Sequence, residues 1–285
     1  MLQLTRRSAR HTFVSLVRAR TYAACVSSPR PLGSITRGTT NPNRLRRCDR
    51  WLLATHRDRL TKGDPPHLVD LGHGASGVTT VEWADRVQAV RPGATVTGLE
   101  IDPERVASAQ AWARPGVDFR LGGFEVPGRP ARIVRAFNVL RQYDETEVEG
   151  PWRTMLARLD PRGLLVEGTC DELGRICTWV EVGADAVPRT LTVSLRLTAL
   201  DSPAVAAERL PKILIHRNVP GEPVHAFLAA LDAEWTRAVG TAPFGPVQRW
   251  RTALAALAAA VWPVQARSRW RLGEVTVPWS LVAPR

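Results

Sequence analysis

From His67 onward, short apolar segments rich in β-branched residues alternate with helical segments, and this alternation restricts the possible folds more than any other feature of the chain. Strands separated by helices require crossover connections, which are right-handed and join parallel strands of one sheet. The sequence therefore predicts an α/β protein with a doubly wound, mostly parallel sheet. The expected parallel strands are residues 67–71, 95–101, 117–121, 132–140 and 164–168.

The helices between these strands have recognisable signals. Thr79 or Thr80 is expected to cap the first helix, which runs to about Val90. Asp102, followed by a proline at the first helical position, predicts a second helix that runs to about Ala113. A third helix is indicated by five apolar residues that share one helical face. They are Val148, Trp152, Met155, Leu156 and Leu159.

The pattern changes in the C-terminal part of the chain. Residues 191–198 alternate strictly between apolar and polar side chains, which is typical of an antiparallel strand with one face open to solvent. Two amphipathic helices follow, around residues 227–235 and 250–261, and residues 269–279 are expected to form a last strand. We therefore expect an antiparallel portion of the sheet and C-terminal helices.

Positive charge is concentrated at the N-terminal end. The chain has 285 residues and a net charge of +12, and its first 65 residues hold 14 basic against three acidic side chains. Residues 1–30 are expected to be a disordered basic extension, with an organellar transit peptide as the alternative. Residues 31–65 are expected to form an N-terminal arm and linker with a short helix over about 44–60. Four arginines on one segment make the arm a candidate for weak contact with RNA or phosphate: Arg44, Arg46, Arg47 and Arg50.

Composition argues against several protein classes. The longest nearly apolar run, residues 253–264, is well short of the roughly 20 residues that span a membrane, so no membrane contact is expected. The four cysteines show no paired spacing, which argues against a disulfide scaffold, a structural zinc site or any other metal site. We expect a cytoplasmic protein. The cysteines are Cys25, Cys48, Cys170 and Cys177.

The most informative segment is the turn after the first parallel strand, residues 69–77 (VDLGHGASG). A strand that turns sharply into a helix while a ligand lies against its backbone needs residues without a Cβ, and Gly72, Gly74 and Gly77 supply them. Their spacing is formally the dinucleotide fingerprint GxGxxG. Asp70, however, would oppose a pyrophosphate and instead suits a cationic ligand. A second acid, Glu100, ends the second strand, where a carboxylate can accept both ribose hydroxyls.

Three short motifs together resemble the class I S-adenosylmethionine-dependent methyltransferases, whose fold is Rossmann-like. They are Asp70-Leu71-Gly72-His73-Gly74, then Gly98-Leu99-Glu100-Ile101-Asp102-Pro103, and Phe137-Asn138-Val139-Leu140 after the fourth strand. The resemblance covers about residues 66–170, which form the expected cofactor-binding core. Residues 171–285 are left to complete the sheet and to supply the helices on the substrate side.

The resemblance implies S-adenosyl-L-methionine as the cofactor and methyl transfer by direct displacement to an acceptor that the sequence does not identify. The implied cofactor-binding residues are Asp70, Gly72, His73, Gly74, Gly77, Glu100, Ile101 and Asn138. Asn138 and Asp171 are the candidate catalytic residues, with Asn138 binding the cofactor or the acceptor and Asp171 acting as a base or orienting a donor. Arg141, Tyr143 and Cys170 are expected nearby.

One departure and two alternatives stand beside this hypothesis. Gly123 occupies the place where the family usually carries an acid for the adenine amine, so Asp118, Glu125 or a backbone group is expected to substitute. The formal GxGxxG keeps an NAD(P)-dependent oxidoreductase open. A nucleic-acid-binding protein on a methyltransferase-like scaffold would use the basic arm, but residues 66–285 are nearly neutral, with 25 basic and 24 acidic side chains.

Overall fold

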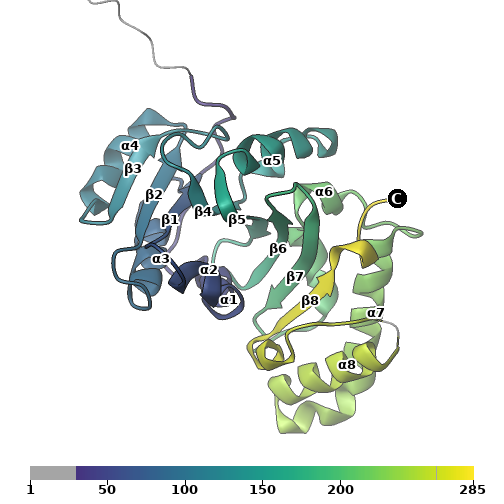
Figure 1. Cartoon of the computed structure of the whole chain (residues 1–285). Coiled ribbons are helices and arrows are strands. Elements are labelled where there is room, and N and C mark those ends of the chain that lie inside the picture. Colours follow the sequence, from purple (N-terminus) through teal and green to yellow (C-terminus); the bar gives the residue numbers. More distant parts are fainter. Residues whose placement is uncertain (1–29, 261) are drawn as a thin grey trace, which may run out of the picture. The chain divides into compact units, whose positions relative to one another are not determined.

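The structure, a computed structural model, describes residues 30–260 and 262–285. Residues 31–285 form one compact unit around a single eight-stranded sheet (Figure 1). The expected basic extension over residues 1–30 lies outside the described residues except for Arg30. Within the described part of the chain, no helix is long and apolar enough to cross a lipid bilayer.

The sheet has the strand order β3-β2-β1-β4-β5-β6-β7-β8. Neighbouring strands from β3 to β5 pair in parallel, and the pairs from β5 to β8 are antiparallel. The predicted α/β fold, a mostly parallel Rossmann-like sheet with an antiparallel portion and C-terminal helices, is therefore confirmed. The strands are β1 His67–Leu71, β2 Thr95–Glu100, β3 Val117–Leu121, β4 Ala131–Phe137, β5 Leu159–Cys170, β6 Ile176–Gly183, β7 Pro188–Leu195 and β8 Glu274–Pro278.

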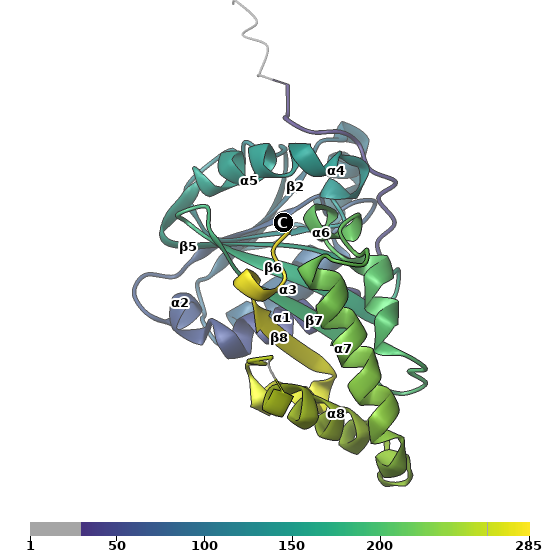
Figure 2. The same ribbon diagram turned by 90° about the vertical axis from the view of Figure 1, so that its right-hand side faces the viewer.

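Helices cover both faces of this sheet. One apolar core joins α1 and α3 to the strands, and the other joins α5, α7 and α8 to the opposite face. Figure 2 shows α5 on one side of the sheet and α1 with α3 on the other. The helices are α1 Arg46–Thr55, α2 Arg57–Thr61, α3 Val78–Gln88, α4 Pro103–Ala109, α5 Glu149–Leu156, α6 Lys212–Ile215, α7 Pro223–Arg237 and α8 Pro246–Ala260.

Several predicted boundaries agree closely with the structure. β1 and β3 begin and end at the predicted residues. The Asp102 carboxylate caps α4 by accepting the backbone N–H of Glu104 at 2.9 Å, and the helix continues as a 3-10 turn to Trp112. The local signals in these segments are strong because an N-cap, a proline and a glycine-rich turn act over only a few residues.

Other local predictions are wrong. α3 begins at Val78 after Gly77, so neither Thr79 nor Thr80 caps it. The helix expected over residues 44–60 is two helices, α1 and α2, separated at His56. The last strand is limited to β8, because residues 269–272 of the predicted strand belong to a 3-10 helix, Arg267–Leu272, instead.

The antiparallel half differs most from expectation. β6 was not predicted, although it pairs with β5 along seven residues. The polar face of β7 is buried rather than open to solvent. Arg47 of α1 donates to the Ser194 hydroxyl at 3.2 Å, and the hydroxyls of Thr192 and Thr276 lie 2.9 Å apart. Packing of α1, which is distant in sequence, therefore buries the face of β7 that the sequence of β7 itself predicts to be open to solvent.

Candidate functional site

The glycine turn after β1 lies where the strand order reverses, between β1 and β4. In an open α/β sheet, the crevice beyond the carboxyl ends of the strands at this reversal is the usual ligand position. Gly72 and Gly74 have φ values of 73° and 76°, a left-handed conformation that favours glycine. Gly77 has an ordinary φ and precedes α3, and a Cβ there would lie 2.5 Å from the Phe119 ring.

The turn is covered by an extended segment of the arm, residues 31–40, which we call the strap (dark purple in Figure 1). Its carbonyl at Gly38 accepts the Ala75 N–H at 2.8 Å, and its Thr40 hydroxyl donates to the His73 carbonyl at 2.7 Å. A Cβ on Gly74 would lie 2.5 Å from the Gly38 oxygen. The bare backbone of the turn thus accommodates the protein's own chain.

The strap continues along the carboxyl ends of β2 and β3. The Leu32 carbonyl accepts the Phe124 N–H at 2.9 Å, and the Leu32 N–H donates to Glu125 at 2.8 Å. A Cβ on Gly123 would collide with the Leu32 oxygen. Of the two acids expected to substitute at Gly123, Glu125 therefore lies beside that glycine, where its carboxylate also accepts the Gly123 N–H at 2.8 Å.

Glu100 ends β2 as expected, and its carboxylate is buried with 3% exposure. One oxygen accepts the Gly74 N–H at 3.0 Å, and the other accepts the Ile101 N–H at 3.0 Å. Glu100, Ile101 and the strap enclose a cavity of only about 20 Å³. The place expected for ribose is therefore filled by the strap and by the turn itself.

Asp70 requires a correction. Its side chain is 2% exposed, and Arg135 of β4 donates from Nε to one carboxylate oxygen at 2.9 Å and lies 2.8 Å from the other. The Thr80 hydroxyl also donates to Asp70 at 2.7 Å, with Thr79 at 3.4 Å. The argument that a free Asp70 carboxylate faces a cationic ligand is wrong, because a buried guanidinium already balances its charge.

Arg135 also pairs with Asp49 of α1, which in turn lies 2.8 Å from Arg86. Burial raises the pKa of Asp49 to about 6, although both arginines act in the opposite direction. Burial opposes the charge of Arg135, but the carboxylates of Asp70 and Asp49 outweigh it and raise its pKa. These residues form a charge-balanced unit beneath the glycine turn.

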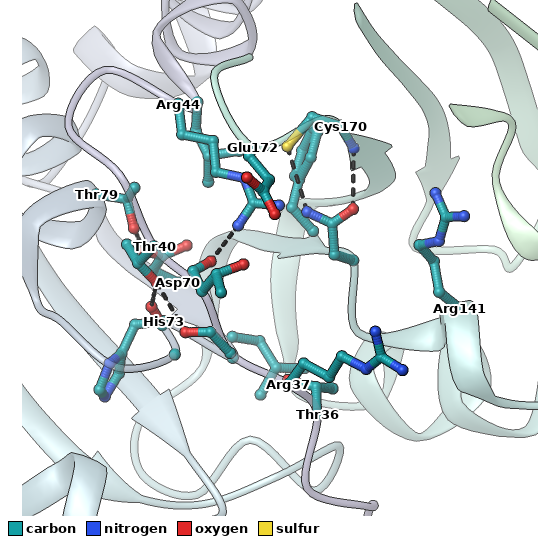
Figure 3. Close-up of a pocket in the computed structure, with 18 of the residues that line it drawn as sticks. Thr36, Arg37, Thr40, Arg44, Asp70, His73, Thr79, Arg141, Cys170 and Glu172 are labelled. Carbon is teal, nitrogen blue, oxygen red and sulfur yellow. Dashed lines mark hydrogen bonds between the residues drawn. The ribbon is translucent and has the colours of Figure 1, made fainter. Parts of the chain in front are cut away.

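The His73 side chain is buried and points away from the cavity that its backbone lines (Figure 3). Its ring packs edge-on against Phe119 with centroids 5.2 Å apart, and neither ring nitrogen has a hydrogen-bond partner among the residues that the structure describes. Burial lowers its pKa, although Asp70 and Glu100 act in the opposite direction. His73 therefore offers a ligand its backbone rather than its imidazole.

Asn138 follows β4 in a left-handed conformation with φ of 61°. Its amide oxygen accepts the Cys170 N–H at 3.0 Å, and its amide nitrogen donates to the Cys170 sulfur at 3.3 Å. A hydrogen bond from Cys177 lowers the pKa of the buried Cys170 thiol to about 7; burial opposes this shift, and Arg44 and Asn138 assist it. Both Asn138 and Cys170 line a cavity of about 440 Å³, which we call the main cavity.

Asp171 lies outside the lining of the main cavity. Its carboxylate accepts the backbone N–H groups of Arg175 at 2.6 Å and Ile176 at 3.3 Å, so it shapes the turn between β5 and β6. The structure therefore does not bring Asp171 together with Asn138 as a pair of side chains facing one cavity.

The main cavity is instead rich in arginine. The predicted residues that line it are Asp70, Gly72, His73, Gly74, Asn138, Arg141 and Cys170. Arg37, Arg44 and Arg209 also line it; of these, only Arg44 was singled out from the sequence, as part of a phosphate-binding arm. Arg47 of the same group is half-buried and donates to the Leu272 carbonyl at 2.9 Å, outside the lining of the main cavity.

The strap and Arg209 were missed for a clear reason. The strap docks mainly through backbone carbonyls and N–H groups, which every residue carries and which leave no signal in a sequence. Arg209 precedes α6 and reaches the cavity only because of the packing of the C-terminal half. The one local indication was the cluster of Pro31, Gly33 and Gly38, which predicts irregular chain but not its position.

The strand order β3-β2-β1-β4-β5 and the helices on both faces of the sheet define an open, Rossmann-like α/β fold. Solved structures that this chain is similar to include magnesium protoporphyrin IX methyltransferase from Synechocystis PCC 6803 with bound SAH. The identity is 22%, the match covers 44% of this chain and 54% of that chain, and the TM-score is 0.35.

A second similar structure is human N-acetylserotonin methyltransferase in complex with SAM, with 22% identity, coverage of 45% of this chain and 35% of that chain, and a TM-score of 0.33. LepI in complex with SAM matches at 17% identity over 39% of this chain and 29% of that chain, with a TM-score of 0.32. The matches thus span about half or less of those chains. No protein-family profile and no curated protein matches this chain.

Proposed function

We propose that this protein binds S-adenosyl-L-methionine at the carboxyl ends of β1 and β2 and transfers its methyl group to an acceptor in the main cavity. The observation that supports this proposal best is the position of the glycine turn. The turn ends β1 at the reversal of strand order and borders a cavity of about 440 Å³, within the range of small-molecule sites.

The residue types at this edge suit the cofactor. Gly72 and Gly74 carry no Cβ at the turn, Glu100 ends β2 where a ribose would be held, and Asn138 follows β4 at the cavity. When bound, the cofactor supplies a methyl group on a positively charged sulfur. The protein's own contribution is to hold the acceptor in line with that group and to exclude water. The entropy lost in aligning the two reactants is a large part of the free-energy barrier to such a displacement.

The proposal is tested by calorimetric titration with S-adenosylhomocysteine, with NAD and with RNA. Glu100→Gln keeps an acceptor oxygen for the Gly74 N–H but replaces the oxygen that accepts the Ile101 N–H with an NH₂ group and removes the charge, so we expect S-adenosylhomocysteine to bind about 10–100-fold more weakly. Glu104→Gln, an exposed acid on α4, is the matched control and should bind as the unaltered protein does. Thermal unfolding of both variants checks that the fold is retained.

The outcomes separate the alternatives. Binding of S-adenosylhomocysteine that weakens only in Glu100→Gln supports the proposal. Binding of NAD without S-adenosylhomocysteine supports an oxidoreductase, and binding of RNA with neither supports the nucleic-acid-binding alternative. Either result would reject methyl transfer at this site.

A further inference from the structure

The main cavity carries an excess of positive charge. Its lining includes Arg37, Arg44, Arg141 and Arg209. Among the described residues, no carboxylate forms an ion pair with any of these four guanidinium groups, whereas arginines elsewhere do pair. Figure 3 shows the Arg37 side chain extending toward the side of the cavity where Arg141 lies, with Arg44 across from them. Several cations thus converge on one space.

Two of these side chains are held in place without being neutralised. Arg44 donates from Nε to the Asp171 carbonyl at 3.0 Å, and Arg141 donates to the Glu208 carbonyl at 3.3 Å. A backbone carbonyl fixes a guanidinium but leaves its charge uncompensated. The arginines are therefore positioned and still able to bind an anion.

Arg209 provides an unpartnered donor. Its Nε is buried and has no hydrogen-bond partner in the structure. The residue itself is anchored, because its backbone carbonyl accepts the hydroxyls of Thr169 and Thr178. A buried N–H without a partner is costly, and a bound acceptor atom would remove that cost.

Acidic residues do little to offset this charge. Arg135 already balances Asp70, and Glu172, the remaining carboxylate in the lining, is exposed to solvent. The Cys170 thiol also lines the cavity, and a hydrogen bond from Cys177, assisted by Arg44, lowers its pKa to about 7. Burial and the neighbouring charge of Arg209 lower the pKa of Arg141. Like charges brought together in this way destabilise the folded protein unless an anion lies between them.

We propose that the main cavity binds an anionic group, a carboxylate or a phosphate, and that this group belongs to the methyl acceptor. The planar fork of a guanidinium matches both groups through paired hydrogen bonds. Only the identification of the anion as part of the acceptor rests on the proposed function; the binding of the anion does not.

The test uses inorganic phosphate and succinate as probes, with sodium chloride at the same ionic strength as the reference. Arg141→Gln and Arg209→Gln remove one cavity charge each, and Arg153→Gln removes an exposed arginine of α5 as the control. We expect either probe to raise the melting temperature of the unaltered protein and of Arg153→Gln, and to bind the two cavity variants at least tenfold more weakly by calorimetry. Without probe, Arg141→Gln should be at least as stable as the unaltered protein, since it relieves like-charge repulsion.

Contrary results are equally clear. If both probes act no more strongly than chloride, or if the cavity variants respond as the control does, the anion site is rejected. An anion response without binding of S-adenosylhomocysteine keeps the anion site and rejects methyl transfer. Binding of S-adenosylhomocysteine without any anion response rejects the anion site and keeps the proposal of methyl transfer.

A separate observation concerns the strap, which occupies the place expected for the nucleoside part of the cofactor. Between the strap and the ends of β2 and β3 only about 20 Å³ is left, enough for about one water molecule. Yet the strap buries little apolar surface, because Leu32 and Ile35 are 52% and 57% exposed. Its docking depends on hydrogen bonds such as those of Gly38 and Thr40, each worth about 1 kcal/mol net.

We infer that the strap is a self-blocking segment that must leave before a nucleoside binds. The apparent affinity of the cofactor is then the intrinsic affinity reduced by the fraction of molecules with the strap undocked. Weakening the contacts that hold the strap should strengthen cofactor binding, whereas loss of a residue that contacts the cofactor would weaken it. This inference rests on the proposed function for its ligand.

The test weakens two strap contacts in the full chain. Thr40→Val removes the hydrogen bond to the His73 carbonyl, and Gln142→Ala removes the donor to the Ser34 carbonyl at 2.8 Å. We expect the double variant to bind S-adenosylhomocysteine about tenfold more tightly, with faster exchange of the Leu32 N–H. Thr154→Val, which loses a hydroxyl contact within α5, is the control and should not change the affinity.

Unchanged or weaker binding in the double variant would reject the strap as a competitor. If neither the unaltered protein nor the double variant binds S-adenosylhomocysteine, the proposed function itself fails.

Discussion

Arg135 is fully buried between two carboxylates that come from different parts of the fold. Asp70 lies beside it on the neighbouring strand, and Asp49 reaches it from α1. The guanidinium also lies over the Trp83 ring, 4.4 Å from its centroid. Removing one member of a buried ionic group leaves an uncompensated charge in the interior, so the group is far more sensitive to single substitutions than a surface ion pair.

Replacing Arg135 with methionine should therefore lower the free energy of unfolding by about 3–5 kcal/mol, because Asp70 and Asp49 lose their shared partner. Urea denaturation measures this loss. Arg153→Met removes an exposed ion pair with Glu149, and it should cost less than about 1 kcal/mol. Equal losses in the two variants would show that the buried group does not stabilise the fold.

At the scale of elements, the contact between the strap and the glycine turn links the arm to the sheet. The strap backbone comes so close to the turn that Gly74 has no room for a side chain. The same residue needs a left-handed φ, which other residues adopt only at a cost. Steric room and backbone conformation therefore both require glycine at this position.

The free energy of unfolding of Gly74→Ala is expected to fall by about 1–2 kcal/mol because alanine adopts the left-handed φ only at a cost. It should fall further because the added Cβ displaces the strap. Thermal unfolding should show the loss, and exchange of the Ala75 N–H, which donates to the strap, should become faster. Gly240→Ala is the matched control, since a Cβ there meets nothing within 4 Å and its φ is ordinary. Similar melting temperatures for the two variants would mean that the strap contact is not tight.

At the scale of the whole molecule, β5 joins the parallel and antiparallel halves of the sheet, and an unpaired acid lies on it. Glu167 is fully buried, and within residues 30–260 and 262–285 neither of its carboxylate oxygens has a hydrogen-bond partner. Burial raises the pKa of Glu167 to about 8. The side chain is therefore mainly protonated and uncharged at neutral pH. A charged carboxylate buried between the parallel and antiparallel halves of the sheet would be costly.

This burial predicts a pH dependence of stability. The folded protein holds the Glu167 proton up to about pH 8, whereas the unfolded chain releases it near pH 4.5. Stability due to this group is therefore present below pH 4.5 and is lost as the pH rises toward 8, at roughly 1.4 kcal/mol per pH unit between the two values. Denaturation of Glu167→Gln between pH 5 and 9 should lack this decline. Glu104→Gln should retain it, and parallel profiles for all three proteins would contradict the assignment.

The parallel half could be predicted from sequence because its signals are local. β1, β3 and the Asp102 cap are each determined by a few neighbouring residues. β6 has no strict alternation, since residues on both of its faces are buried. The buried polar face of β7 depends on Arg47, which lies 147 residues earlier in the chain.

The candidate site was only partly predictable for the same reason. The glycine turn, Glu100 and Asn138 could be located at one edge of the sheet from their places at strand ends. The partner of Asp70 could not be located from the sequence, because Arg135 is 65 residues away. That this residue is an arginine does not reveal in which direction its side chain points. The strap contacts are made by backbone atoms and carry no residue signature.

The buried ionic contacts of Asp49, Asp70 and Arg135 predict how these three positions vary among natural variants of this protein. A chain that loses Arg135 leaves Asp70 without a cationic partner and Asp49 with Arg86 alone, and a chain that loses Asp70 and Asp49 leaves Arg135 as an uncompensated buried positive charge. Natural variants of this protein should therefore keep all three residues or replace them jointly with uncharged ones, so that positions 49, 70 and 135 are inherited as a set.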